Sequence, residues 1–161
     1  MGLLFDAVRG GVAGGAATWF MDLVTTGVYE QQPADATARE LAARPNGKTT
    51  VANLVDRVEQ RTGITIPPEQ RPAVEHAAHY AFGVVPGALY GIVRSRVPGV
   101  GLLRGLGYGA IIWAVNDEWL NTKLGLAGPP EAYPSEAHMR GLVGHLALGG
   151  ATDTFLALLG G

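Results

Sequence analysis

The chain of 161 residues has no cysteine and few charged side chains. The lack of cysteine excludes disulfide bonds, thiolate metal sites and cysteine nucleophiles. Charged residues make up 16% of the sequence, whereas soluble domains contain about 25%. Hydrophobic residues reach 47%, and the net charge is -2. This balance excludes a disordered chain and a nucleic-acid-binding protein, and it favours a membrane protein.

Long stretches with few charges recur four times along the chain. Residues 10–28, 72–93, 99–121 and 137–160 together hold seven of the 26 charged side chains. Each is close to the length of about 20 helical residues that crosses a hydrocarbon core of about 30 Å. We therefore predict an all-α fold, an integral membrane four-helix bundle in one domain over residues 1–161. A soluble bundle is the alternative, since a fully buried helix shows the same apolar pattern.

Basic residues in short loops indicate which ends of the spans face the cytoplasm. The turn between the second and third spans carries Arg94, Arg96 and Arg104 and no acidic residue. The loop over residues 122–136 has Lys123 as its single basic residue, against two acidic ones. Both termini are therefore predicted to be cytoplasmic. We expect the first span to be retained rather than cleaved as a signal peptide.

On this topology the segment 29–71 lies outside, with six basic and six acidic residues. Residues 35–43 and 49–61 have the pattern of short helices, the second with apolar residues at amphipathic spacing and Thr50 as its candidate cap. We expect amphipathic helices that lie on the membrane surface. A cap that binds a partner protein is the alternative.

Two sequence motifs occur twice in the same order, which predicts an internal duplication. Residues 15–22 match residues 109–116 as G-A-x-x-W-x-x-[D/N], and residues 79–83 match residues 145–149 as H-[YL]-A-[FL]-G. Two such hairpins would form parallel repeats, related by an axis along the membrane normal. Glycines at every fourth position let helices approach closely in lipid. They also predict a homo-oligomer or a subunit of a larger membrane complex.

Polar side chains that a bilayer disfavours gather toward the outer ends of all four spans, where they are expected to face the bundle interior. They are Asp22, Glu75, His76, His79, Asn116, Asp117, Glu118, His138 and His145. Imidazoles opposite carboxylates suit a transition-metal ion, and the predicted ligands are His79, His145, Asp22 and Glu118. The alternative is that each histidine makes a structural hydrogen bond. A haem between His79 and His145 is disfavoured, because few large apolar residues are present to form its pocket.

No catalytic signature is present, so an enzyme is not expected. The sequence lacks G-x-S-x-G and H-E-x-x-H motifs, and its serines, Ser95 and Ser135, fall in predicted loops. The first functional hypothesis is a membrane binding or accessory protein with an outer-facing polar pocket. The second is a small transporter or channel for protons or a solute, with a path over Asp22, His79, His145 and Asp153.

Glycine, aromatic and histidine motifs over nearly the whole chain resemble those of one family. They are His79-Tyr80-Ala81-Phe82-Gly83, Pro86-Gly87-Ala88-Leu89-Tyr90-Gly91, Gly107-Tyr108-Gly109, Trp113, Asn116-Asp117-Glu118-Trp119, His138 and Gly141-Leu142-Val143-Gly144-His145. With them the chain resembles the YagU-like family of small bacterial inner-membrane proteins. The resemblance implies a multi-helix protein of the bacterial inner membrane, and it implies no particular activity.

Overall fold

A computed structural model describes residues 2–101 and 103–160, and within them it is helical without strands. The long helices are α1 (Leu3–Tyr29), α4 (Arg71–Arg94) and α7 (Ser135–Leu158), and the short ones are α2 (Ala34–Ala43) and α3 (Thr50–Thr62). A further rod consists of α5 (Leu106–Ile112), a π-helix (Trp113–Leu120) and α6 (Asn121–Lys123). Single 3₁₀ turns occur at Pro45–Gly47 and Pro130–Ala132. The all-α prediction is confirmed.

Four helical rods stand where the four spans are predicted, with two differences at their starts. The first rod begins at Leu3 rather than at residue 10. The third begins at Leu106 rather than at residue 99, because residues 98–101 and 103–105 form turns. Arg104 and Gly105 there have positive φ angles, which a continuous helix does not accommodate. Leu102, which lies within the predicted third span, is outside the described residues.

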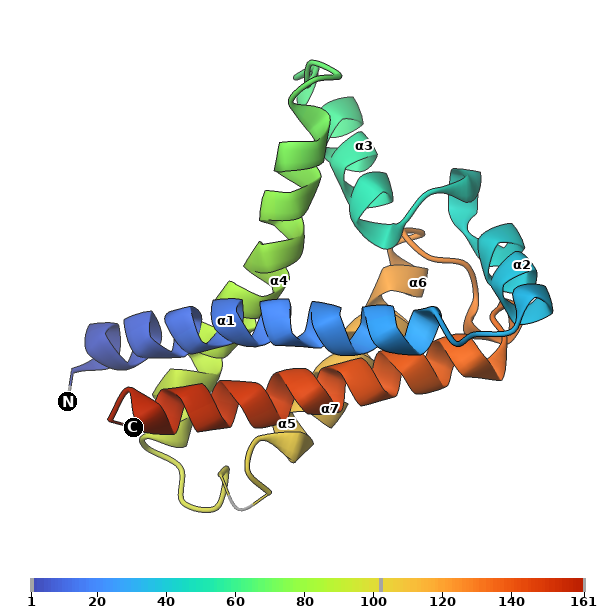
Figure 1. The fold of residues 1–161 in the computed structure, drawn as a ribbon. Helices are drawn as coiled ribbons and strands as arrows, with labels where there is room; N and C mark the ends of the chain where they lie inside the picture. The colour runs from blue at the N-terminus through green and yellow to red at the C-terminus, as the bar shows by residue number, and fades with distance from the viewer. Residues whose placement is uncertain (1, 102, 161) are drawn as a thin grey trace.

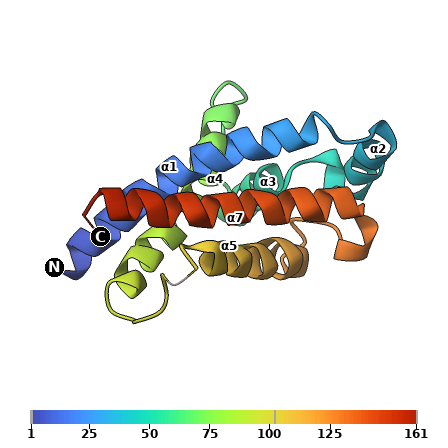
Figure 2. The ribbon, with the colours of Figure 1, turned by 60° about the horizontal axis from the view of Figure 1, so that its bottom comes forward.

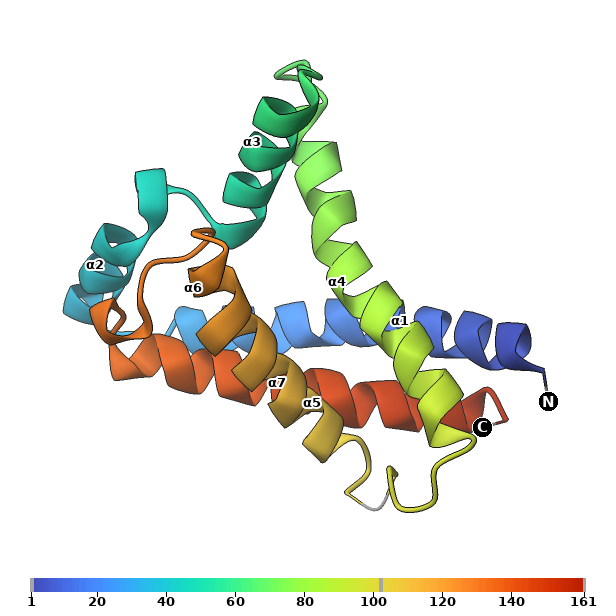
Figure 3. The same cartoon turned by 180° about the vertical axis from the view of Figure 1, so that it is seen from behind.

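The rods pack in the order α4, α1, α7, α5. Helices α1 and α7 run side by side in opposite directions, so the two ends of the chain lie together (Figures 1 and 2). Helix α4 crosses α1, and the α5–α6 rod crosses α7 (Figure 3). We call the end with both termini and residues 95–105 the terminal end. The opposite end, covered by α2, α3 and residues 124–134, is the capped end (Figure 1).

Glycines bring α1 and α4 into backbone contact where they cross. A Cβ atom on Gly10 would lie 2.9 Å from the Cα atom of Gly91, and one on Gly14 would lie 3.0 Å from that of Gly87. A Cβ on Gly83 would overlap the Thr18 hydroxyl. Residues larger than glycine would therefore separate these helices.

The crossing of α5 and α7 uses glycine in the same way. A Cβ atom on Gly149 would lie 2.9 Å from the Cα atom of Gly109, and one on Gly109 would overlap the carbonyl group of His145. Gly105, with φ +78°, starts α5 against Gly149 and Asp153. Each half of the bundle thus contains one glycine-mediated crossing, and the duplication itself stays a prediction.

Large apolar side chains face outward on every rod. Val8, Val12, Trp19, Phe20 and Leu23 of α1 are exposed, as are Val85 and Leu89 of α4, Ile111 and Val115 of the third rod, and Met139 and Val143 of α7. Many of the buried side chains are small or polar, including Ala13, Ala17, Thr18, Thr152 and Asp153, alongside the larger Tyr90, Leu148 and Leu156. Large aliphatic residues are usually the most buried, so the exposure of so many of them on these rods is unusual.

Within the described part, one helix combines the length and the apolar composition of a membrane span. It is α7, in which an 18-residue segment has a mean hydropathy of 1.2. The membrane-spanning four-helix bundle stays a prediction for all four rods.

Candidate functional site

A pocket of about 400 Å³ lies inside the bundle toward the capped end. Its walls come from α1, α4, the π-helix and α7, and residues of α2 and the Thr49–Val51 segment contribute to its roof. The apolar part of its lining includes Met21, Phe82, Ile112, Trp113 and Leu148. Among the polar lining residues are His79, Asn116, Asp117, Glu118, His138 and His145, all singled out from the sequence. These six residues, from α4, the π-helix and α7, therefore lie around one pocket, whereas Asp22 is not part of its lining.

One histidine–carboxylate pair joins α1 to α4. The Nε2 atom of His79 donates a hydrogen bond of 2.8 Å to Oδ1 of Asp22. Both side chains are about one-third exposed, at 35% and 38%. The pair therefore holds two helices together at the side of the pocket while staying accessible to water.

A second pair joins the π-helix to α7. His138 contacts a Glu118 carboxylate oxygen at 2.7 Å through Nδ1 and the carbonyl oxygen of Pro130 at 3.0 Å through Nε2. A carbonyl and a carboxylate both accept hydrogen bonds, so both ring nitrogens donate. The imidazole is then a cation, and it neutralises Glu118.

His145 is arranged differently and leaves its neighbouring carboxylate incompletely paired. Its Nδ1 atom donates to the carbonyl oxygen of Gly141 at 2.9 Å and stands 3.5 Å from Oδ2 of Asp117. In the neutral tautomer with its hydrogen on Nδ1, Nε2 is a hydrogen-bond acceptor. Asp117 also accepts a long hydrogen bond of 3.4 Å from Asn116. Its side chain is 34% exposed, which leaves the carboxylate open to a ligand.

Trp113 places an unused donor beside this carboxylate. Its Nε1 atom is buried and has no hydrogen-bond partner within the described residues. Gly141 packs against both groups, since a Cβ atom there would lie 3.2 Å from Nε1 of Trp113 and 3.6 Å from Oδ2 of Asp117. A buried N–H group without a partner is costly, so this position favours an acceptor from outside the chain.

A buried ion-pair network on α2 and α7 closes the roof of the pocket. Arg140 contacts Glu40 through both terminal nitrogens at 2.7 and 2.9 Å, and Arg44 contacts the same carboxylate at 2.7 Å. Burial acts to raise the pKa of Glu40, but hydrogen bonds from Arg140, Arg44 and Gln32 outweigh it and lower the pKa to about 2. Glu40 is therefore ionised at neutral pH, and its charge is compensated.

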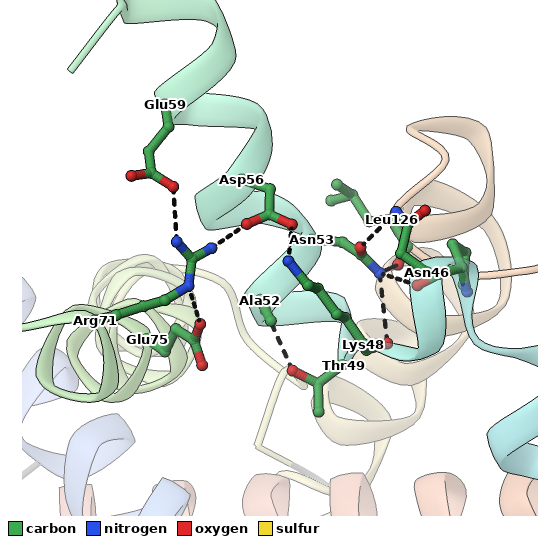
Figure 4. A network of polar contacts seen from close by, with 11 residues as sticks. Asn46, Lys48, Thr49, Ala52, Asn53, Asp56, Glu59, Arg71, Glu75 and Leu126 are labelled. Atoms are coloured by element: carbon green, nitrogen blue, oxygen red, sulfur yellow. Dashed lines mark hydrogen bonds and ion pairs between the residues drawn. The ribbon is translucent and has the colours of Figure 1, made fainter. Parts of the chain in front are cut away.

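Helix α3 is attached by a separate polar network (Figure 4). Asn53 donates to the carbonyl oxygens of Pro45 and Leu126, both at 3.1 Å. Arg71 binds Asp56 and also Glu59 at 2.8 Å, which ties α3 to the start of α4. The hydrogen bond from Ile66 and the contact with Arg71 lower the pKa of Glu59.

The predicted cap of α3 is wrong by one residue. The side chain of Thr49, not that of Thr50, accepts the hydrogen bond from the Ala52 N–H group. Thr50 is the first helical residue, while Thr49 has the extended backbone of an N-cap.

The four predicted metal ligands do not come together. Asp22 pairs with His79, Glu118 pairs with His138, and His145 faces Asp117. Within the part of the chain that the structure describes, no group of three or more His, Asp or Glu side chains is placed to hold a metal ion. Asp22 and Glu118 are each hydrogen-bonded to one histidine, as in the structural alternative, whereas Asp117 stands 3.5 Å from His145.

Three further predicted residues lie away from the pocket lining. Glu75 binds Arg71 at 3.0 Å, and the His76 ring packs on Tyr80 with ring centres 4.8 Å apart. Asp153 is at the terminal end, where it accepts hydrogen bonds from Tyr90 at 2.7 Å and Arg94 at 2.9 Å. It therefore does not extend the pocket toward the terminal end.

Sequence reasoning missed the roof of the pocket. Glu40 and Arg44 have the i, i+4 spacing of an ordinary surface pair, and nothing in the sequence links them to Arg140, one hundred residues away. The sequence places Trp113 in a repeat motif and does not indicate that it lines a site.

The chain matches no protein-family model, no curated protein and no solved structure.

Proposed function

We propose that this chain is an integral protein of the bacterial inner membrane that binds a ligand. Its pocket opens toward the outer face and takes a small polar ligand. The observation that carries the proposal is a pocket lined by apolar side chains and by a cluster of polar ones, between rods that expose large apolar side chains. The pocket volume is within the range of about 300–1,000 Å³ that small-molecule sites have.

The outward-facing apolar side chains support a lipid environment. Contiguous exposed apolar surface on a monomer marks an interface with a partner or a membrane, and here it covers all four rods. The 27 residues of α1 and the 24 residues of α4 and of α7 give helices of about 40 and 36 Å. Both lengths exceed the hydrocarbon core of about 30 Å.

The distribution of charges supports the orientation. Arg94, Arg96 and the exposed Arg104 lie at the terminal end, as cytoplasmic loops require. The pocket is at the opposite end, beneath α2 and α3. The polar helices α2 and α3 are then on the outside and act as a roof rather than as surface helices spread on the lipid.

The absence of native cysteine makes this orientation directly testable. Ile64→Cys places a single thiol in an exposed loop of the capped end, and Val97→Cys places one in an exposed loop of the terminal end. In intact cells, a membrane-impermeant maleimide should label only Ile64→Cys. Labelling of Val97→Cys should require permeabilised membranes. Equal labelling of both without permeabilisation would contradict the orientation.

A second pair of single-cysteine variants tests the pocket. Thr25 lines it, whereas Thr152 is fully buried between helices. A small charged thiol reagent should modify Thr25→Cys from the outside and leave Thr152→Cys unmodified. Equal protection of both thiols would show that the pocket is closed, and it would overturn the binding proposal.

The transporter hypothesis has less support from the geometry. Its pathway would have to continue from the pocket to Asp153, which Tyr90 and Arg94 enclose at the terminal end. The glycine crossings lie between these two levels and leave the helix backbones in contact. Binding from one side therefore fits the arrangement better than passage through it.

A further inference from the structure

The charges around the pocket are unevenly compensated, and one carboxylate is left over. The charged residues in its lining are Glu40, Arg44, Asp117, Glu118 and Arg140. Glu40 is bonded to both arginines, and Glu118 is bonded to His138. Asp117 has no Arg or Lys partner within the described residues, and the nearest imidazole nitrogen, at 3.5 Å, is already donating to Gly141.

The groups around Asp117 include one unused donor, the Nε1–H group of Trp113, and groups that can accept hydrogen bonds. In the neutral tautomer with its hydrogen on Nδ1, His145 offers Nε2 as an acceptor. Asn116 also lines the pocket. The rings of Trp113 and Phe82 line the same pocket, and aromatic faces attract cations. An anionic ligand would meet an uncompensated carboxylate here, whereas a cation would neutralise it.

We propose that the pocket binds a small organic ammonium ion, with its charged nitrogen at Asp117 between His145 and Trp113. This inference rests on the proposed binding function and names its ligand class. An ammonium group donates up to three hydrogen bonds and needs one carboxylate. A metal ion needs the cluster of ligands that the described residues do not form. The volume of about 400 Å³ also exceeds what a bare ion fills.

Three probes with a phenyl ring and three different charges test the ligand class. Benzylammonium, benzyl alcohol and phenylacetate each carry the head group on a benzylic carbon, and each is titrated into the detergent-purified full chain in a calorimeter. Benzylammonium should bind most tightly and phenylacetate most weakly. Asp117→Asn should weaken benzylammonium about tenfold or more, because a charge-assisted hydrogen bond in the pocket is lost. The same substitution should change the affinity for benzyl alcohol little.

Two control variants separate the charge from the shape of the site. Asp35→Asn removes an exposed carboxylate of α2 and should leave all three affinities unchanged. Gly141→Ala adds a methyl group between Trp113 and Asp117 and should weaken benzylammonium and benzyl alcohol alike. Circular dichroism should show that each variant keeps its helix content.

The possible failures of the two proposals are distinct. Saturable binding of phenylacetate or benzyl alcohol that equals or exceeds that of benzylammonium would overturn the ammonium assignment and keep the pocket as a binding site. Benzylammonium affinity that Asp117→Asn leaves unchanged would do the same. Absence of saturable binding for all three probes, with Thr25→Cys protected from reagent, would overturn both proposals.

Discussion

The two ends of the bundle use charged residues in opposite ways. At the terminal end, buried Asp6 and Asp153 are bonded to Arg96 and Arg94 at 2.8 and 2.9 Å. At the capped end, three histidine–carboxylate contacts surround a cavity of about 400 Å³. Ion pairs therefore join the helices at the terminal end, whereas charged side chains line an accessible pocket at the capped end.

The distance between helix backbones accounts for this difference. Gly10 and Gly14 hold α1 against α4 at backbone contact on the side toward the terminal end. Toward the capped end the α1 residues that line the pocket are larger than glycine, namely Thr18, Met21 and Thr25, and the last two pack on Gly144 of α7. Glycines let the helix backbones touch near the terminal end, whereas larger side chains keep the helices apart near the capped end. The pocket forms where the helices are apart.

Breaking the backbone contact near the terminal end should have the largest effect. Gly14→Ala places a methyl group on the carbonyl oxygen of Gly83, which is backbone and cannot rotate away. We expect a loss of at least about 3 kcal/mol of folding free energy, the upper range for overpacking. The measurement is the thermal midpoint of the purified protein.

The matched control for this change is Gly11, three residues earlier on α1, which packs on the side chain of Val84 rather than on a backbone carbonyl. A methyl group on Gly11 would make an ordinary contact of 3.5 Å with Val84. Gly11→Ala should therefore be neutral or stabilising, because alanine has the higher helix propensity by about 1 kcal/mol. Equal thermal midpoints for Gly11→Ala and Gly14→Ala would contradict the glycine-mediated crossing.

Removing a charge from the terminal end should have the next largest effect. Asp153→Ala leaves Arg94 and the Tyr90 hydroxyl without their acceptor in the bundle interior. Removal of one partner from a buried ion pair costs about 3–5 kcal/mol, here reduced because Arg94 is 37% exposed. We expect about 2 kcal/mol, with benzylammonium binding in the folded fraction retained. Thr154→Ala, at an exposed neighbour, should change the thermal midpoint little.

The roof of the capped end should respond to pH as well as to mutation. The folded pKa of Glu40 is about 2, below its ordinary value of about 4.5. Its contribution to stability is therefore fully present above about pH 4.5 and is lost as the pH falls toward 2. Glu40→Gln should lower the thermal midpoint at neutral pH, and the difference from the wild type should shrink over that acidic interval.

Proteolysis next to α2 gives a second measurement of the effect of Glu40→Gln. Without the Glu40 charge, α2 loses its bonds to Arg140, and trypsin should cleave at Lys48 faster. Asp35→Asn is the control, because the Asp35–Arg39 pair is exposed at 73% and 59% and such surface pairs contribute about 0–1 kcal/mol. A pH-independent effect of Glu40→Gln would contradict the role of its charge.

The sequence predicted the helical rods well and the partners within the site less well. Small residues at every fourth position predicted close crossings, but only geometry shows that Gly10 and Gly14 form the contact while Gly11 and Gly15 face Val84. Which residues of the third rod face the histidines was also missed. Successive helical residues point in different directions, and Trp113–Leu120 is a π-helix, which changes that direction along the rod.

The site shows the same limit. The repeat alignment matched Asp22 to Asn116, whereas Asp117 is the residue that contacts a histidine, and Glu118 contacts His138 rather than His79 or His145. Glu40 reaches the pocket only because α2 folds back over α7. Long-range pairs of this kind leave no periodic signal in a single sequence.

The smallest effect is expected where the capped end is most open. His79 and Asp22 are each about one-third exposed, and partly solvated pairs of this kind contribute on the order of 1 kcal/mol or less. Asp22→Asn should therefore shift the thermal midpoint far less than Asp153→Ala does, although both remove one aspartate that bonds α1 or α7 to α4. The double variant Asp22→Asn/His79→Gln gives the coupling between the two side chains in a mutant cycle. A coupling as large as that of the Asp153–Arg94 pair would mean that the pocket wall is as rigid as the terminal end, and the contrast between the two ends would then lie in their shape alone.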